Sequence, residues 1–189
     1  MRVVSGEAKG RRLKTPGGDR IRPTADRVKE SLFEIIGERI RDARVLDLFA
    51  GTGNLGIEAL SRGARSVLFV DADRAAIRLI GQNLTLTRLD DRAETWRSDA
   101  RAALGKLAGS GRCFDIVLLD PPYGTGYEEP VLRRLSRSEI LPPGSLTVIE
   151  HDRRIDLAER IDSLERFDQR RFGDTMLSFY RQSPEKARP

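Results

Sequence analysis

A glycine-rich loop between an apolar strand and a helix is the feature that most restricts how this chain can fold. Residues 44–49 are predicted to form a buried strand, and the loop 50–56 (Ala-Gly-Thr-Gly-Asn-Leu-Gly) follows directly. A helix is predicted over 55–62, with Gly63 just beyond its end. This arrangement lets a ligand approach bare backbone at a helix N-terminus.

Strands and helices alternate through the rest of the chain. Further strands are predicted over 66–71, 94–97, 114–119 and 146–150, and further helices over 100–107 and 128–137. The helix expected after the strand 66–71 has Ile77, Ile80 and Leu84 on one face. Near the end, residues 167–172 and 175–180 flank Gly173-Asp174, a two-residue hairpin signal. We therefore predict an α/β fold with a doubly wound, mostly parallel sheet and an antiparallel hairpin at its C-terminal edge.

The length and composition fit one catalytic domain. A chain of 189 residues with 39% hydrophobic content can bury one good core but hardly two. We expect a basic extension over 1–23, a catalytic domain over 24–182 and a flexible tail over 183–189. Within the extension, Val3-Val4 and the segment near Leu13 are expected to pair as a hairpin, and Thr24 is predicted to be the N-cap of the next helix.

Composition also disfavours several classes of protein. No apolar stretch approaches membrane-spanning length, and the amino terminus lacks the hydrophobic region of a secretory signal, so we expect a cytoplasmic protein without a membrane partner. Cys113 and His151 are the only residues of their kinds. This argues against an internal disulfide, a zinc site and thiol–imidazole catalysis, and we expect no metal.

Two carboxylates bear on the ligand that the glycine loop holds. Gly51, Gly53 and Gly56 fit the dinucleotide pattern G-x-G-x-x-G, and Asp71 ends the next strand, where a ribose-binding carboxylate belongs. A nicotinamide-dependent oxidoreductase is therefore one interpretation. Asp47, however, ends the first strand and faces the loop, where its charge would repel a pyrophosphate but attract the sulfonium and ammonium groups of S-adenosylmethionine. The charge pattern favours this methyl donor.

The tetrapeptide Asp120-Pro121-Pro122-Tyr123 ends a predicted strand, at the sheet edge where open α/β folds bind ligands. The two prolines make the turn stiff. If Asp120 and the Pro121 carbonyl accept the two N–H bonds of an exocyclic amine, they aim its lone pair, while Tyr123 stacks on the base. The tetrapeptide thus predicts methylation of an amine on a flat group, and a plain turn beside a core tyrosine is the alternative.

The positive charge of the chain is concentrated near its start. The net charge is +5 and the isoelectric point is near 9.8. The basic residues before the first predicted helix and in its first turns are Arg2, Lys9, Arg11, Arg12, Lys14, Arg20, Arg22, Arg27 and Lys29. Such a patch is an electrostatic footprint for a phosphate backbone, although basic runs also occur on proteins that bind no nucleic acid. A noncatalytic RNA-binding module is a further alternative.

Several segments together resemble one family. They are residues 2–6, 10–13, 22–33, 47–62, 120–123 and 172–175, and with them the chain is similar over most of its length to the RsmD family of bacterial 16S rRNA (guanine-N2)-methyltransferases. The glycine loop and the Asp-Pro-Pro-Tyr turn are common to many methyltransferases, whereas the segment 22–33 is far more particular. Amino-methyltransferases with the same turn that act on DNA adenine or protein glutamine remain an alternative.

The resemblance implies a Rossmann-like class I methyltransferase fold, S-adenosylmethionine as donor, and one guanine amine of 16S rRNA as acceptor, in an assembling 30S subunit. We expect a monomer. The implied donor-binding residues are Asp47, Ala50, Gly51, Thr52, Gly53, Asp71, Ala72, Asp99 and Ala100. The implied catalytic residues are Asp120, Pro121, Pro122 and Tyr123, and the implied RNA-binding residues are Arg11, Arg12, Arg22, Arg27 and Lys29.

Two of these assignments have structural alternatives. Asp99 follows the strand over 94–97 and is equally suited to cap the helix that begins at Ala100, a role compatible with binding the adenine amine. Arg22 and Arg27 can instead form ion pairs near Asp26 and Glu30.

Overall fold

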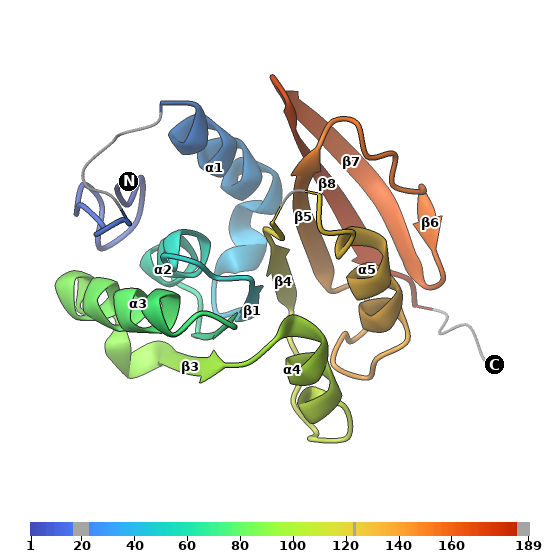
Figure 1. The fold of residues 1–189 in the computed structure, drawn as a ribbon, viewed down its shortest axis with the longest axis horizontal. Helices are drawn as coiled ribbons and strands as arrows, with labels where there is room; N and C mark the ends of the chain where they lie inside the picture. Colours follow the sequence, from blue (N-terminus) through green and yellow to red (C-terminus); the bar gives the residue numbers. More distant parts are fainter. Residues whose placement is uncertain (17–22, 123, 185–189) are drawn as a thin grey trace.

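An eight-stranded sheet forms the centre of the computed structural model, which describes residues 1–16, 23–122 and 124–184 (Figure 1). The strands are β1 Arg44–Leu48, β2 Ser66–Asp71, β3 Ala93–Arg97, β4 Ile116–Leu119, β5 Leu146–Asp152, β6 Arg160–Ile161, β7 Leu164–Phe172 and β8 Thr175–Gln182. The helices are α1 Pro23–Ile36, α2 Asn54–Ser61, α3 Arg74–Thr87, α4 Ala100–Leu107 and α5 Glu128–Ser136, with short 3₁₀ turns at Gly37–Ile40 and Asp90–Arg92.

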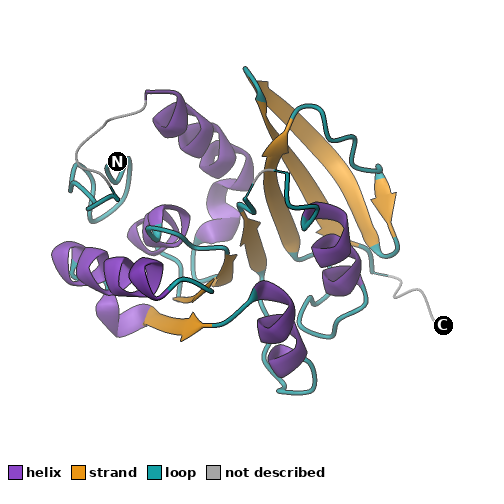
Figure 2. Cartoon of the chain, viewed as in Figure 1, coloured by secondary structure: helices purple, strands orange, loops and turns teal. Residues whose placement is uncertain are grey.

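The strand order is β3-β2-β1-β4-β5-β8-β7-β6. Strands β1 to β5 pair in parallel, and β6, β7 and β8 add an antiparallel edge (Figure 2). The chain leaves β1 in one direction along the sheet and returns to place β4 on its other side. The order therefore reverses between β1 and β4, and ligands of open α/β sheets bind at the carboxyl ends of such strands. The predicted doubly wound fold is confirmed.

The sheet is covered on both faces. Apolar side chains of α1, α2 and α3 pack with Val45, Ile116, Leu118 and Val148 on one face. Those of α4 and α5 pack with the alternate residues of the same strands on the other face. Because side chains alternate along a strand, this division fixes which strand-end residues point toward α1–α3.

The amino-terminal segment pairs with itself as predicted. Arg2 and Arg12 form an antiparallel bridge, and the backbone N–H of Val3 donates to the carbonyl of Arg11 at 2.9 Å. Val3 and Leu13 are each only 1% exposed and join the core formed with α1–α3. The segment thus packs against the core that α1, α2 and α3 form with the sheet.

Most element boundaries lie within two residues of their predicted positions, but β7 begins three residues before the predicted 167, and two further points differ. Helix α1 begins at Pro23, which places Thr24 in the first turn, so the prediction of Thr24 as N-cap is wrong. The two-residue strand β6 was not expected. None of the described helices is long and apolar enough to cross a membrane.

Candidate active site

A cavity of about 470 Å³ lies at the carboxyl ends of β1, β2 and β4. We call it the Asp71 cavity. It is lined by Phe49, Gly51, Val70, Asp71, Ala72, Ser98, Asp99, Ala100, Asp120, Pro121, Pro122 and Tyr127. The structure therefore brings predicted donor-binding residues from the ends of β1, β2 and β3 into one hollow with three residues of the predicted catalytic turn, which follows β4. Tyr123, the fourth residue of that turn, lies outside the described residues.

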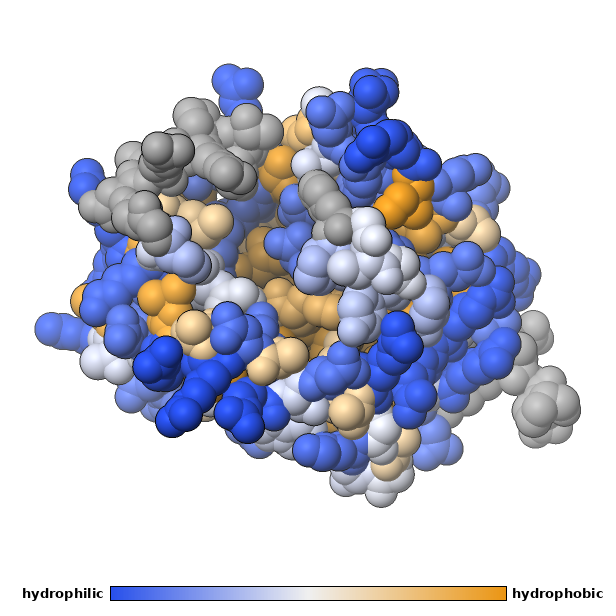
Figure 3. All heavy atoms as spheres, viewed as in Figure 1, coloured by the Kyte–Doolittle hydropathy of each residue, from blue (hydrophilic) through white to orange (hydrophobic). Residues whose placement is uncertain are grey.

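A second cavity of about 330 Å³, the Glu150 cavity, adjoins the first. It is lined by Met1, Val28, Lys29, Asp47, Phe49, Ala50, Gly51, Thr52, Asn54, Leu55, Asp120 and Glu150. The two cavities share Phe49, Gly51 and Asp120, so the Asp120 carboxylate lies where they meet. Figure 3 shows a hollow with apolar side chains near the centre of the view.

The glycine loop is hydrogen-bonded to Asp71, the last residue of β2. Gly51 has a left-handed φ of 54°, and its N–H donates to Asp71 Oδ2 at 2.8 Å. The other oxygen of Asp71 accepts the N–H of Asp73 at 2.8 Å. Two backbone donors thus fix the Asp71 carboxylate at the cavity wall. Each oxygen keeps a further lone pair for a hydroxyl of a ligand.

The far side of the same loop is tied to α3. The side-chain amide of Asn83 donates to the carbonyl of Thr52 at 2.9 Å and to that of Lys14 at 3.1 Å, and Asn83 Oδ1 accepts the N–H of Lys14 at 2.8 Å. Asn83 is fully buried. One amide therefore joins the glycine loop to the amino-terminal segment.

Asp47 is buried, with 1% of its surface exposed. Its Oδ2 accepts the N–H of Gly56 in the first turn of α2 at 2.9 Å. Burial, opposed by the hydrogen bond from the Gly56 N–H and aided by the nearby carboxylates of Asp120 and Asp71, raises the pKa of Asp47 to about 7. The Asp47 side chain thus holds the first turn of α2 next to the glycine loop. A positively charged ligand nearby would favour its ionised form.

Asp120 is exposed by its surface area. The protein that surrounds its carboxylate nevertheless reduces its hydration and raises its pKa to about 6. The prolines on its C-terminal side have no backbone N–H to offer it. A cationic ligand in either cavity would favour its ionised form. Perturbed carboxyl groups of this kind are common at functional sites.

Asp99 is the N-cap of α4, which confirms the capping role that the sequence predicted for it. Its Oδ1 accepts the N–H of Arg101 at 2.9 Å and that of Ala102 at 3.3 Å. Its Oδ2 accepts the hydroxyl of Tyr127 at 3.1 Å. The cap holds Asp99 and Ala100 at the edge of the Asp71 cavity, the position expected for the adenine end of a donor.

Two aromatic residues of the Asp71 cavity were missed by the sequence reasoning. Phe49 has a φ of 78°, which is rare for a bulky residue and is typical of strained functional positions. Its ring meets that of Tyr127 edge-on, with centroids 5.4 Å apart. The signal for Phe49 was its place between a strand and the first glycine. Tyr127 had none, because its contact depends on the loop after the proline turn.

The predicted RNA-binding residues differ in their surroundings. Arg12 and Arg27 are exposed, whereas Arg11 is half-buried and donates to the carbonyl of Leu86 at 2.6 Å. Arg22 lies outside the described residues.

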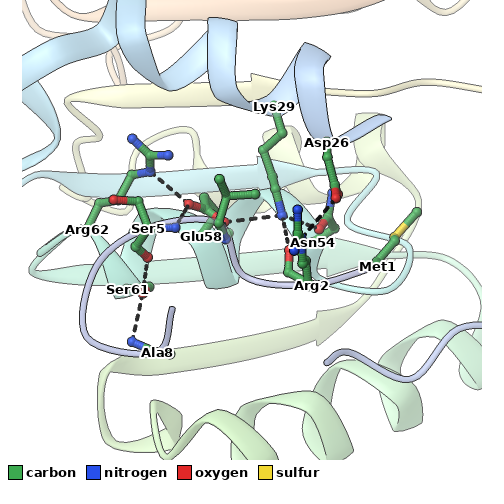
Figure 4. A network of polar contacts seen from close by, with 12 residues as sticks. Met1, Arg2, Ser5, Ala8, Asp26, Lys29, Asn54, Glu58, Ser61 and Arg62 are labelled. Atoms are coloured by element: carbon green, nitrogen blue, oxygen red, sulfur yellow. Dashed lines mark hydrogen bonds and ion pairs between the residues drawn. The ribbon is translucent and has the colours of Figure 1, made fainter. Parts of the chain in front are cut away.

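Lys29 does not fit the predicted role of gripping RNA phosphates. Its side chain is 1% exposed, and Nζ lies 3.1 Å from Glu58 Oε2 (Figure 4). It also donates to the carbonyl of Arg2 at 2.6 Å and to Asn54 Oδ1 at 2.8 Å. The sequence does hold a signal for this burial that was missed, because Lys29, Phe33 and Ile36 are spaced to share one face of α1.

Glu58 gathers further donors around the same ion pair. Its carboxylate accepts the backbone N–H groups of Val4 and Ser5 at 2.8 and 2.9 Å and the guanidinium of Arg62 at 2.8 Å (Figure 4). This network fixes the amino-terminal segment on α2. Lys29 therefore has a positioning role in the fold.

Comparisons with known proteins agree with this geometry. A family model described as "conserved hypothetical protein 95" matches residues 1–181. "Putative rRNA methyltransferase YlbH" of Bacillus subtilis is 41% identical over 181 residues, which cover 96% of this chain and 98% of that protein. Ribosomal RNA small subunit methyltransferase D of Haemophilus influenzae is 35% identical over 154 residues, 81% of this chain and 79% of the relative.

The fold is similar to solved structures as well. The structure of "putative methyltransferase yhhF" from Escherichia coli matches with a TM-score of 0.85 at 32% identity, covering 98% of this chain and 99% of that one. At this coverage the similarity extends over nearly the whole chain.

Proposed function

The chain belongs to the RsmD family of rRNA methyltransferases, whose model carries the description conserved hypothetical protein 95, and on that premise we propose that it methylates the exocyclic N2 amine of a guanine in 16S rRNA. S-adenosylmethionine supplies the methyl group from its sulfonium. The observation that supports the proposal is the position of Asp120, which lines both cavities and so adjoins the residues expected to hold both ends of the donor.

The residues of the Asp71 cavity fit the adenosine part of this donor. Asp71 would offer carboxylate lone pairs to the ribose hydroxyls, and Ala72, Asp99 and Ala100, which line the same cavity, would contact the adenine. Phe49 and Tyr127 supply apolar walls. Asp47 and the loop Ala50 to Gly53 would hold the methionine end, where the Asp47 carboxylate meets positive charge.

The acceptor amine is aligned by the proline turn. Asp120 and the Pro121 carbonyl accept its two N–H bonds, which directs the nitrogen lone pair toward the donor. Tyr123 stacks on the extruded base. Such alignment can supply up to ~7–11 kcal/mol of the barrier, more than one acid or base usually gives. The proton lost after transfer passes to Asp120 or to water.

The nicotinamide alternative is weakened by the surroundings of the third glycine of the loop. A Cβ on Gly56 would lie 2.2 Å from the ring of Phe69 and 2.9 Å from Asp47 Oδ2. This glycine is therefore needed for packing against β1 and β2. A pyrophosphate at the loop would face the Asp47 carboxylate.

We further propose that the substrate is an assembling 30S subunit in the cytoplasm, and that the enzyme acts as a monomer. The exposed Arg12 and Arg27 would contact RNA phosphates. Arg11 can join them only if it gives up its bond to the Leu86 carbonyl.

One experiment tests the substrate class and the site together. Small ribosomal subunits with their assembly intermediates, purified RNA, DNA and protein from a strain that lacks this protein are each incubated with the purified enzyme and radioactive S-adenosylmethionine, then digested and separated. We expect label in 16S rRNA alone, at a single nucleotide that digests as N2-methylguanosine. Label in DNA as N6-methyladenine or in protein as methylglutamine would replace the proposal with the corresponding alternative.

A further inference from the structure

The structure assigns a specificity-determining residue to the acceptor side: we propose that the carboxylate of Glu150 accepts the N1–H of the target guanine and so selects guanine over adenine. The inference rests on the proposed function and deepens it. Glu150 lines the Glu150 cavity together with Asp120, and nothing in the sequence reasoning had given it a role.

The register of the sheet places the two carboxylates side by side. Strands β4 and β5 are parallel neighbours, and Leu119 pairs with Ile149. Asp120 and Glu150 each follow one of these paired residues. They therefore occupy adjacent positions at the carboxyl edge of the sheet.

Both carboxylates also point to the same side. Leu118 and Val148 contribute to the core cluster with α1–α3, whereas Leu119 and Ile149 contribute to the opposite cluster. By strand alternation, the side chains that follow Leu119 and Ile149 face the α1–α3 side. The cavity lining agrees, because Val28 and Lys29 of α1 lie on its wall with both acids.

The edge of guanine matches two neighbouring acceptors. Its N2 amine and its N1–H are adjacent donors. With Asp120 and the Pro121 carbonyl on the two amine hydrogens, a second carboxylate on N1–H would leave no hydrogen of this edge unpaired. Adenine presents an acceptor at N1 beside its amine, and a carboxylate there would face a lone pair. A carboxylate that faces the N1 lone pair of adenine lowers the affinity for adenine, because both groups are acceptors. A site that accepts a hydrogen bond from its substrate rejects an analogue without that donor. Glu150 thus distinguishes the two bases, while Asp120 alone would accept either amine.

The test replaces the mapped target guanine of the rRNA by 2-aminopurine, which keeps the C2 amine but has an acceptor at N1. For the unmodified protein we expect kcat/KM on guanine to exceed that on 2-aminopurine by ~10–100-fold, the range typical of one specific base contact. In Glu150→Gln the amide can accept from guanine or donate to 2-aminopurine, so this ratio should fall to within a few-fold of one. The exposed Glu159→Gln variant is the control and should keep the full ratio.

The ratio separates this role from a structural one, because a damaged fold would lower both activities by the same factor. An unchanged ratio in Glu150→Gln, or equal activity of the unmodified protein on both bases, would overturn the inference while rRNA methylation stands. If the unmodified protein does not methylate guanine at all, the proposed function fails and this inference fails with it.

Discussion

Asp47 and Gly56 form one unit: the carboxylate accepts the Gly56 N–H at 2.9 Å, and the same oxygen lies 2.9 Å from where a Cβ on Gly56 would be. The bond joins the end of β1 to the first turn of α2, and the missing side chain lets the ring of Phe69 pack against it. The third glycine of the loop therefore serves packing under the ligand site.

Gly56→Ala should destabilise the protein. A methyl group 2.2 Å from the Phe69 ring forces the helix or the ring to move, at a cost of ~1–3 kcal/mol or more. Urea unfolding followed by circular dichroism measures the loss. Gly81→Ala is the matched control, because Gly81 is exposed within α3 with nothing within 4 Å of its Cβ position, and it should be neutral or slightly stabilising.

Stability should rise as the pH falls from 8 to 6. The pKa of Asp47 is about 7 in the folded protein, above its ordinary value, so the folded state binds a proton in this range that the unfolded state does not. This contribution is complete at low pH and is lost as the pH rises through about 7. Asp47 alone should add roughly 1 kcal/mol between pH 8 and pH 6.

Asp47→Asn provides the comparison, since the amide oxygen can still accept the Gly56 N–H but does not titrate. Donor-free protein is unfolded in urea at both pH values. The variant should lack most of the gain seen in the unmodified protein. An equal gain in both proteins would mean that other groups are responsible.

Lys29→Met should cost up to ~3–5 kcal/mol of stability, because it removes the buried cation paired with Glu58 and leaves that carboxylate with only the guanidinium of Arg62 and two backbone N–H donors. Arg65→Met is the control: Arg65 and its partner Asp42 are 63% and 74% exposed, so their ion pair should contribute less than ~1 kcal/mol. Both are measured by urea unfolding. A Lys29 variant of normal stability but weakened RNA binding would restore the phosphate-gripping role that its burial argues against.

The fold was largely predictable, because buried parallel strands and amphipathic helices leave strong local patterns. Asp71, Asp99 and Asp120 could be placed because each follows such a strand, and parallel strand ends share one sheet edge. The ion pair of Lys29 with Glu58 depends on tertiary packing, and a lysine in isolation suggests a surface. Glu150 escaped notice because the predicted strand simply ended there. Its proposed role depends on the pairing of β4 with β5, which places Glu150 beside Asp120.

Arg12→Ala with Arg27→Ala should weaken RNA binding without unfolding the protein. Each phosphate contact contributes about 0.9 to the slope of log affinity against log salt, so the double variant should lower that slope by up to about 2. Filter binding over a salt series measures it. Arg160→Ala, in the exposed ion pair with Glu165 at the far edge of the sheet, should leave the slope unchanged. The same slope in all three proteins would remove Arg12 and Arg27 from the interface.

The most direct measurement is the turnover of Asp120→Ala, because Asp120 stands where the two cavities meet. We expect methyl transfer to rRNA to fall by a factor of ~10²–10³, as for the loss of one oriented polar contact. Calorimetry with S-adenosylhomocysteine should give an affinity within a few-fold of that of the unmodified protein. Unchanged turnover in a folded, donor-binding variant would contradict the claim that Asp120 aligns the acceptor amine.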